Sequence, residues 1–182
     1  ALETGRCYVE DRGYAKFTLF NEIVKADSSY VCRLRDNSSY KVLQERTLTP
    51  EDIGVILARA LSDHHQALNG AKILILGVAY KKDVDDNRES PALKIMDLLN
   101  QEGAEVSYND PHIPRCAGMR HYPHFDLTSA PLNERALQES DLVLLVTDHS
   151  AYDYAWIASQ ARLIVDTRNA FKGIKGKHIY PA

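Results

Sequence analysis

Short apolar runs alternate with helix-like segments between residues 71 and 182, and this alternation constrains the fold more than any other feature of the sequence. An apolar run that ends in glycine, as residues 71–77 do, is typical of a buried parallel strand. Strands that alternate with helices predict a parallel sheet with right-handed crossovers. We therefore expect an α/β, doubly wound, Rossmann-like domain. Its expected strands are residues 71–77, 104–109, 141–147 and 162–166, with an edge strand at 178–180.

Helix signals lie between these runs. Ser90 and Pro91 predict an N-cap followed by the first helical residue, and Gly103 predicts the end of that helix. Shorter helices are expected at 133–139 and 152–160, and residues 112–132 are expected to be irregular. Binding sites of such sheets lie beyond the carboxyl ends of the strands. The segments expected to carry function are therefore residues 77–90, 110–115, 147–153 and 166–172.

Residues 1–50 differ from the rest, because they predict a small strand-rich N-terminal segment. A helix is expected at 17–25, and two strands at 29–35 and 40–45. Residues 51–70 predict a linking helix that packs on the α/β domain. Thr49 is its expected cap, Pro50 its first residue, and Asn69-Gly70 the place where it ends. The predicted division is 1–50, 51–70 and 71–182.

Composition narrows the classes of partner. The chain has 22 basic and 25 acidic residues, a net charge of −3, which argues against a nucleic-acid coat and against a polybasic membrane binder. Three widely spaced cysteines do not form a disulfide framework, and no apolar run is long enough to span a membrane. Residues 1–10 also lack the pattern of a signal peptide. We expect a cytoplasmic protein with no membrane partner.

The loop at residues 78–89 is unusually long and charged. It has about twelve residues, where about two to six are typical of such loops. It carries Lys81, Lys82 and Arg88 just before a helix N-terminus, which suits phosphate. The alternative is a solvated loop with internal Lys–Asp pairs. Gly77 does not begin a Gly-x-Gly-x-x-Gly fingerprint, so NAD is not expected to approach this turn in the standard way.

Arg168 follows the strand that ends at Asp166, so it is expected at the same edge of the sheet. Its guanidinium predicts a second clamp for phosphate or carboxylate. The alternative is a surface arginine paired with Asp166 or with Asp148.

Metal and hydrolase sites are not expected. Histidine and cysteine gather in one irregular segment, but their spacing matches no common zinc finger. These residues are His112, Cys116, His121 and His124. No Gly-x-Ser-x-Gly motif is present, so a serine hydrolase is not indicated.

The sequence from residue 55 onward resembles the C-terminal, UDP-binding domain of the UDP-glucose/GDP-mannose dehydrogenase family. The most specific part is the signature Gly-x-Ala-Tyr-Lys followed by Arg-Glu-Ser-Pro, which is closest to enzymes acting on UDP-N-acetylhexosamines or UDP-glucose. The matching stretches are LILGVAYKKDVDDNRESPAL (74–93), YNDP (108–111), SDLVL (140–144), VDTRN (165–169) and ALSDH (60–64).

This resemblance implies both a reaction and roles for particular residues. The family oxidises the C6 alcohol of a nucleotide sugar to a carboxylate in two NAD-dependent steps, through a cysteine thiolate. By resemblance, Tyr80 and Lys81 contact the UDP-sugar, and Arg168 reaches the substrate. Arg88 approaches the NAD cofactor, which another domain of the family holds.

The catalytic parts of the family are not found in this sequence. It has no Gly-x-Gly-x-x-Gly half, and none of Cys7, Cys32 and Cys116 lies in the family's catalytic context. We therefore expect no catalytic residue here, and no oxidation by this chain alone.

Residues 1–52 resemble a fragment of a DDE-type insertion-sequence transposase, in the stretches YVEDRGYAKF (8–17) and SSYVCRLRDN (28–37). Asp11 would match the second metal-binding carboxylate, but the other two acids are not identifiable, so no two-metal site is expected. The hypothesis is a fused gene, a mobile-element fragment joined to the tail of a nucleotide-sugar dehydrogenase. The alternative is a distinct domain whose likeness is accidental.

Three functions follow from these features. The first is a UDP-sugar-binding surface. The second is a non-catalytic module that docks on a complete dehydrogenase or self-associates. The third is a nucleic-acid binder, which the nine basic and ten acidic residues among positions 1–70 argue against.

Overall fold

The computed structural model describes residues 7–10, 25, 29–32 and 49–182 of the chain. The chain forms two compact units, Ala1–Arg46 and Thr47–Ala182. In the first unit, β1 (Cys7–Glu10) pairs in parallel with β2 (Ser29–Cys32). The predicted strand at 40–45, almost all of the predicted helix at 17–25, and Asp11 of the transposase-like stretch lie outside the described residues.

The second unit is an α/β domain built on a five-stranded parallel sheet, which confirms the predicted fold class. The strand order is β4-β3-β7-β8-β9. Its elements in chain order are α2 (Pro50–Asp63), β3 (Lys72–Leu76), α3 (Pro91–Gln101), β4 (Glu105–Asn109), β5 (Arg115–Ala117), β6 (Asp126–Thr128), α4 (Glu134–Glu139), β7 (Leu142–Leu145), α5 (Tyr154–Gln160), β8 (Ile164–Asp166) and β9 (Ile179–Pro181).

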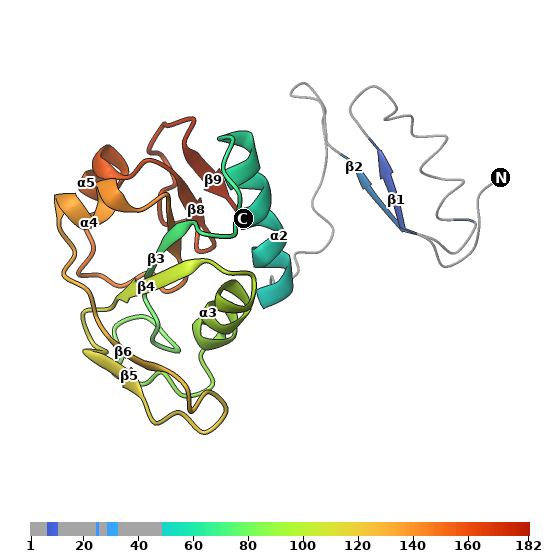
Figure 1. Cartoon of the computed structure of the whole chain (residues 1–182). Coiled ribbons are helices and arrows are strands. Elements are labelled where there is room, and N and C mark those ends of the chain that lie inside the picture. The colour runs from blue at the N-terminus through green and yellow to red at the C-terminus, as the bar shows by residue number, and fades with distance from the viewer. Residues whose placement is uncertain (1–6, 11–24, 26–28, 33–48) are drawn as a thin grey trace. The chain divides into compact units, whose positions relative to one another are not determined.

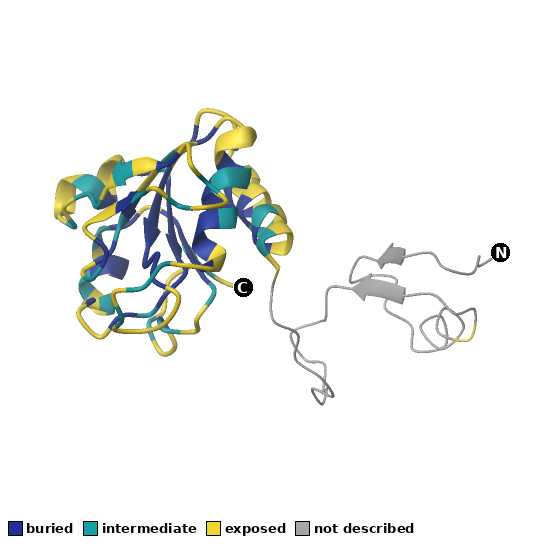
Figure 2. Cartoon of the chain, turned by 90° about the horizontal axis from the view of Figure 1, so that it is seen from below, coloured by how far each residue is buried: buried dark blue, intermediate teal, exposed yellow. Residues whose placement is uncertain are grey.

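Helices cover both faces of this sheet (Figure 1). Ile73 and Ile75 of β3 pack with α2 and α3, while Leu74 and Leu76 pack with α4 and α5. All four side chains are buried. Burial on both faces explains why the strands are continuous apolar runs rather than alternating ones. Figure 2 shows the buried strands enclosed by exposed helix faces and loops.

The helix expected after Thr49 forms α2, and the capping box forms with it. The Asp52 amide donates to Thr49 Oγ1 at 3.2 Å, and the Thr49 amide donates to Asp52 Oδ2 at 2.9 Å. The expected end near residues 69–70 was wrong, because α2 ends at Asp63. His65 then adopts a left-handed φ of 60°, which turns the chain toward β3.

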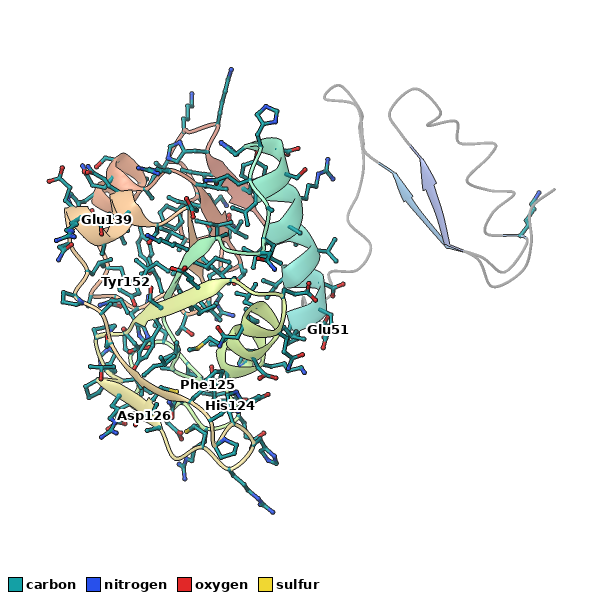
Figure 3. All side chains as sticks on the ribbon, in the orientation of Figure 1. Glu51, His124, Phe125, Asp126, Glu139 and Tyr152 are labelled. Carbon is teal, nitrogen blue, oxygen red and sulfur yellow. The ribbon has the colours of Figure 1, made fainter. Side chains whose placement is uncertain are left out.

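Residues 112–132 were expected to be irregular, and this was wrong in part. β5 and β6 form a short antiparallel pair, in which Cys116 lies opposite Leu127. Two strands of three residues are too short to give a readable alternation. Phe125, labelled in Figure 3, is buried in the core that α3 covers, and His124 lies 3.2 Å from Asp97 of α3.

Within the part of the chain that the structure describes, no helix combines the length and the apolar character needed to cross a bilayer.

Candidate functional site

The strand order reverses between β3 and β7, and the ends of these two strands meet. Gly77 follows β3 with a φ of 79°. A Cβ at this position would lie 2.6 Å from Thr147 Cβ and 2.8 Å from Thr147 N, so only glycine fits. The carboxyl side of this reversal is where ligands bind in open α/β sheets. It is therefore the candidate site.

Asp110, directly after β4, organises the backbone at this edge. Its Oδ2 accepts hydrogen bonds from the amides of Val78 at 2.7 Å and Ala79 at 2.9 Å. Its Oδ1 accepts from the amides of His112 at 2.8 Å and Ile113 at 3.1 Å. A buried carboxylate that receives four backbone donors fixes the turns after β3 and β4 against each other.

His149 lies between this carboxylate and the charged loop. The ring is fully buried, and its Nε2 lies 3.1 Å from Asp110 Oδ2. Its Nδ1 accepts a hydrogen bond from the amide of Asp83 at 2.9 Å. Because an amide can only donate, Nδ1 carries the lone pair and Nε2 carries the proton that Asp110 accepts. The histidine is therefore the neutral Nε2-H tautomer.

Asp83 ties the charged loop to the turn after β7. Its carboxylate accepts from the Ser150 amide at 2.8 Å and from the Ser150 hydroxyl at 2.7 Å. The bond from the Ser150 amide, followed by that from its hydroxyl, holds the pKa of Asp83 below its usual value of 3.8. Asp83 also adopts a left-handed φ of 57°. The long loop is thus anchored by specific contacts.

Tyr80 and Lys81, both predicted to contact a substrate, lie side by side on this loop. The Tyr80 side chain is exposed, and the Lys81 ammonium lies 5.4 Å from the centre of its ring. This distance is within the range of a cation–π contact. Both groups face solvent and are accessible to a ligand.

Arg168 lies where three loops meet at one carboxylate. Its Nε lies 3.2 Å from Asp148 Oδ1, and Lys82 Nζ lies 3.9 Å from Asp148 Oδ2. Of the two partners left open for this arginine, the side chain pairs with Asp148. Asp166 accepts the backbone amide of Arg168 instead, at 2.9 Å. The loops after β3, β7 and β8 therefore converge here.

Arg88 lies elsewhere. It forms a two-point pair with Asp86, with Nε 3.0 Å from Oδ1 and Nη2 2.8 Å from Oδ2. This pair lowers the pKa of Asp86 to about 2. Arg88 also lines a groove of about 470 Å³, together with Lys94, Arg120 and Tyr122. Between described residues, no hydrogen bond or ion pair joins Arg88 to Lys81 or Arg168.

Cys116, the cysteine whose side chain the structure describes, is not activated as a nucleophile. Cys116 is buried, and burial raises the pKa of its thiol. The thiol therefore stays protonated at neutral pH.

Asp110 and His149 were not singled out from the sequence, and Asp148 was named only as an alternative partner of Arg168. A usable signal was present, because all three lie in segments expected to carry function. Their roles depend on partners that are distant in the chain, such as the 39 positions between Asp110 and His149.

Comparison with known proteins places these residues among dehydrogenase sequences. The model of the UDP-glucose/GDP-mannose dehydrogenase family, UDP binding domain, matches residues 74–173. The UDP-N-acetyl-D-mannosamine dehydrogenase of Methanocaldococcus jannaschii is 34% identical over 108 residues, which cover 54% of this chain and 22% of that protein. The UDP-glucose 6-dehydrogenase of Rhizobium meliloti is 30% identical over 112 residues, covering 58% and 24%.

A solved structure agrees with these matches. The UDP-D-ManNAc dehydrogenase of Pyrococcus horikoshii superposes with a TM-score of 0.58 at 25% identity, over 72% of this chain and 30% of that one. The chain spans about a quarter of the length of the curated relatives it matches.

Proposed function

Because the chain belongs to the UDP-glucose/GDP-mannose dehydrogenase family, we propose that its second unit binds the diphosphate of a UDP-sugar at the carboxyl edge of the sheet. The relatives named above act on UDP-glucose or UDP-N-acetyl-D-mannosamine, and either kind of sugar is compatible with this proposal.

The observation that carries the proposal is the convergence at Asp148. Lys82 and Arg168 come from different loops and share this one carboxylate, so two cations from separate loops lie close together. A diphosphate has the charge and the spread of oxygens to bridge two such cations. Lys81 adds a third cation on the same loop, and the exposed Tyr80 ring offers an apolar face beside it.

The turn after β3 does not fit a dinucleotide. In a dinucleotide fold its amides would face a pyrophosphate, but here those of Val78 and Ala79 donate to Asp110. The space over Gly77 is filled by Thr147. NAD therefore enters the proposal only through Arg88, whose guanidinium is exposed and which we propose approaches a cofactor held by a separate domain. We propose that oxidation of the sugar needs that domain and does not occur on this chain alone.

The expected affinity is low. One charge-assisted contact contributes about 1.5–3 kcal/mol, and two or three such contacts must also offset the cost of association. We expect a dissociation constant near the millimolar range for UDP and for UDP-sugars.

Isothermal titration calorimetry with UDP, UDP-glucose and UDP-N-acetylglucosamine tests the proposal. Lys81→Ala and Arg168→Ala should each weaken binding by about tenfold or more, the equivalent of one charged contact. Arg115→Ala is the matched control, because Arg115 is an exposed cation paired with Asp126 on the β5–β6 hairpin. Absence of heat at several millimolar ligand would refute the proposal. So would equal loss in all three variants.

The alternative of a non-catalytic assembly module from a fused gene gains no support from these matches. The transposase-like stretch at 1–52 lies outside the matched residues and stays a prediction.

A further inference from the structure

Three potential metal ligands gather at the carboxyl edge of the sheet, outside the cations of the proposed diphosphate surface. The ligand atoms of Asp83, His112 and His149 all lie within 4.8 Å of one another. They come from the loops after β3, β4 and β7, so the sheet topology brings them together. We propose that this trio binds a divalent first-row transition metal ion such as Zn²⁺. The proposal does not depend on UDP binding.

His149 has the orientation of a metal-ligating histidine. Such histidines donate one ring N–H to a carboxylate and turn the other nitrogen toward the metal. Here Nε2 donates to Asp110, and the Nδ1 lone pair lies on the side of Asp83 and His112, where it accepts from the Asp83 amide. The buried Asp110 carboxylate fixes both the tautomer and the ring.

His112 supplies an unused nitrogen. Its Nε2 atom is buried and has no hydrogen-bond partner in the structure. A buried polar atom without a partner is costly, which calls for an explanation. This atom lies 3.7 Å from Asp83 Oδ1, and the two histidine rings lie 4.8 Å apart between centres. A metal ion between the rings would satisfy the unpaired nitrogen.

Two of the three separations between the ligand atoms are close to what a metal requires. Ligands at about 2.0–2.1 Å from a tetrahedral ion lie about 3.3 Å from one another. Asp83 Oδ1 lies 3.6 Å from His149 Nδ1 and 3.7 Å from His112 Nε2. The remaining separation, between the two ring nitrogens, is within 4.8 Å, so the partly exposed His112 ring must move toward His149 when the metal binds. Two imidazoles and one carboxylate favour zinc, cobalt or iron over magnesium, and they leave coordination positions open.

One hydrogen bond must be exchanged for the metal. Without the metal, the Asp83 amide donates a hydrogen bond to His149 Nδ1 at 2.9 Å. A metal ion at Nδ1 would displace this amide, so the backbone at Asp83, which has a left-handed φ of 57°, must shift. The same residue that withdraws its amide contributes the carboxylate ligand.

This site differs from the zinc site considered in the sequence analysis, which the spacing of its residues along the chain argued against. The earlier candidates were His112, Cys116, His121 and His124, whereas the trio takes only His112 from that segment. Its other members lie 29 positions before and 37 positions after His112 in the sequence.

Calorimetric titration of the full chain with Zn²⁺, and visible spectroscopy with Co²⁺, test the proposal. We expect the wild type to bind one equivalent of metal. His112→Ala should not bind it, or should bind it at least tenfold more weakly. Loss of a residue that only orients a ligand already weakens metal binding about tenfold or more, so loss of a ligand should cost at least as much. Co²⁺ should give the absorption bands of a low-symmetry nitrogen and oxygen site in the wild type and not in His112→Ala. Mg²⁺ should not bind at this site.

Two further variants keep the test decisive. His121→Ala is the matched control, an exposed histidine of the same segment, and it should bind metal like the wild type. Asp83→Asn keeps an acceptor for Ser150 but loses the charge, so it tests the trio if His112→Ala does not fold. Cysteine thiols elsewhere in the chain could also bind Zn²⁺, but they are the same in all variants. The test therefore compares metal binding between variants. Equal binding by the wild type, His112→Ala and Asp83→Asn would overturn the proposal, as would loss of binding in His121→Ala.

Discussion

Replacing Asp110 with asparagine tests whether one buried carboxylate holds the candidate site together. The substitution keeps the shape of the side chain and replaces one oxygen with an NH₂ group. Oδ1 accepts two backbone amides, and Oδ2 accepts two amides and the His149 ring. Whichever way the new amide turns, its NH₂ group faces at least two donors that no longer have an acceptor.

The magnitude follows from the number of donors left unpaired. Each buried donor without a partner costs about 1–3 kcal/mol, so two donors cost about 2–6 kcal/mol. Domains of this kind are stable by about 5–15 kcal/mol in total. Asp110→Asn should therefore remove a large part of the free energy of unfolding of the second unit. The unit should stay folded wherever its total stability exceeds this loss.

Urea unfolding followed by tryptophan fluorescence measures this loss. Trp156 is the only tryptophan of the chain and lies on α5, so its signal reports the second unit. Asp126→Asn is the matched control, because it is the same chemical change at an exposed ion pair (Figure 3). The control should unfold close to the wild-type midpoint.

The reasoning fails if Asp110→Asn loses no more stability than Asp126→Asn. It also fails if the loss is below about 1 kcal/mol, because a single unpaired buried donor already costs about that much.

Three further predictions concern the same unit. Gly77→Ala should lower the free energy of unfolding by more than about 2 kcal/mol in denaturant unfolding, since the new Cβ would lie 2.8 Å from the backbone N of Thr147. Gly70→Ala is the control, because Gly70 has a similar φ of 81° but open space around it. It should show a smaller loss, of about 1–2 kcal/mol. Leu57→Ala should cost about 2–5 kcal/mol in the same assay, because this side chain of α2 is fully buried. Arg88→Ala should raise the pKa of Asp86 from about 2 toward 3.8 in a carboxyl NMR titration. Because the folded-state pKa is the lower one, the pair stabilises the native state above pH 3.8 and ceases to do so as the pH falls toward 2.

Much of the fold was predictable because its signals are local. The run at 71–77 became β3, and Ser90 caps α3 by accepting from the Ala92 amide at 3.3 Å. In both cases the cause lies within a few residues of the effect. The end of α2 and the β5–β6 pair were missed, because a turn and two three-residue strands carry too little pattern.

The candidate site was predictable only in outline. The rule for parallel sheets correctly indicated the loops that converge. Arg168 shares the Asp148 carboxylate with Lys82 of the long loop. The sequence left open which acid would pair with it, because Asp148 and Asp166 both lie near the end of an expected strand. The pairing of Arg88 with Asp86 was not expected.

The sequence by itself determined which segments become strands and helices, and therefore which loops share an edge. Apolar periodicity and capping residues act over one or two turns, so they can be read along the chain. Only the tertiary structure decided what those loops do at that edge. The contacts of His149 with Asp83 and Asp110 span 66 and 39 positions. Whether a buried carboxylate meets amides, a histidine or solvent depends on how strands pack in space, and no local pattern records that.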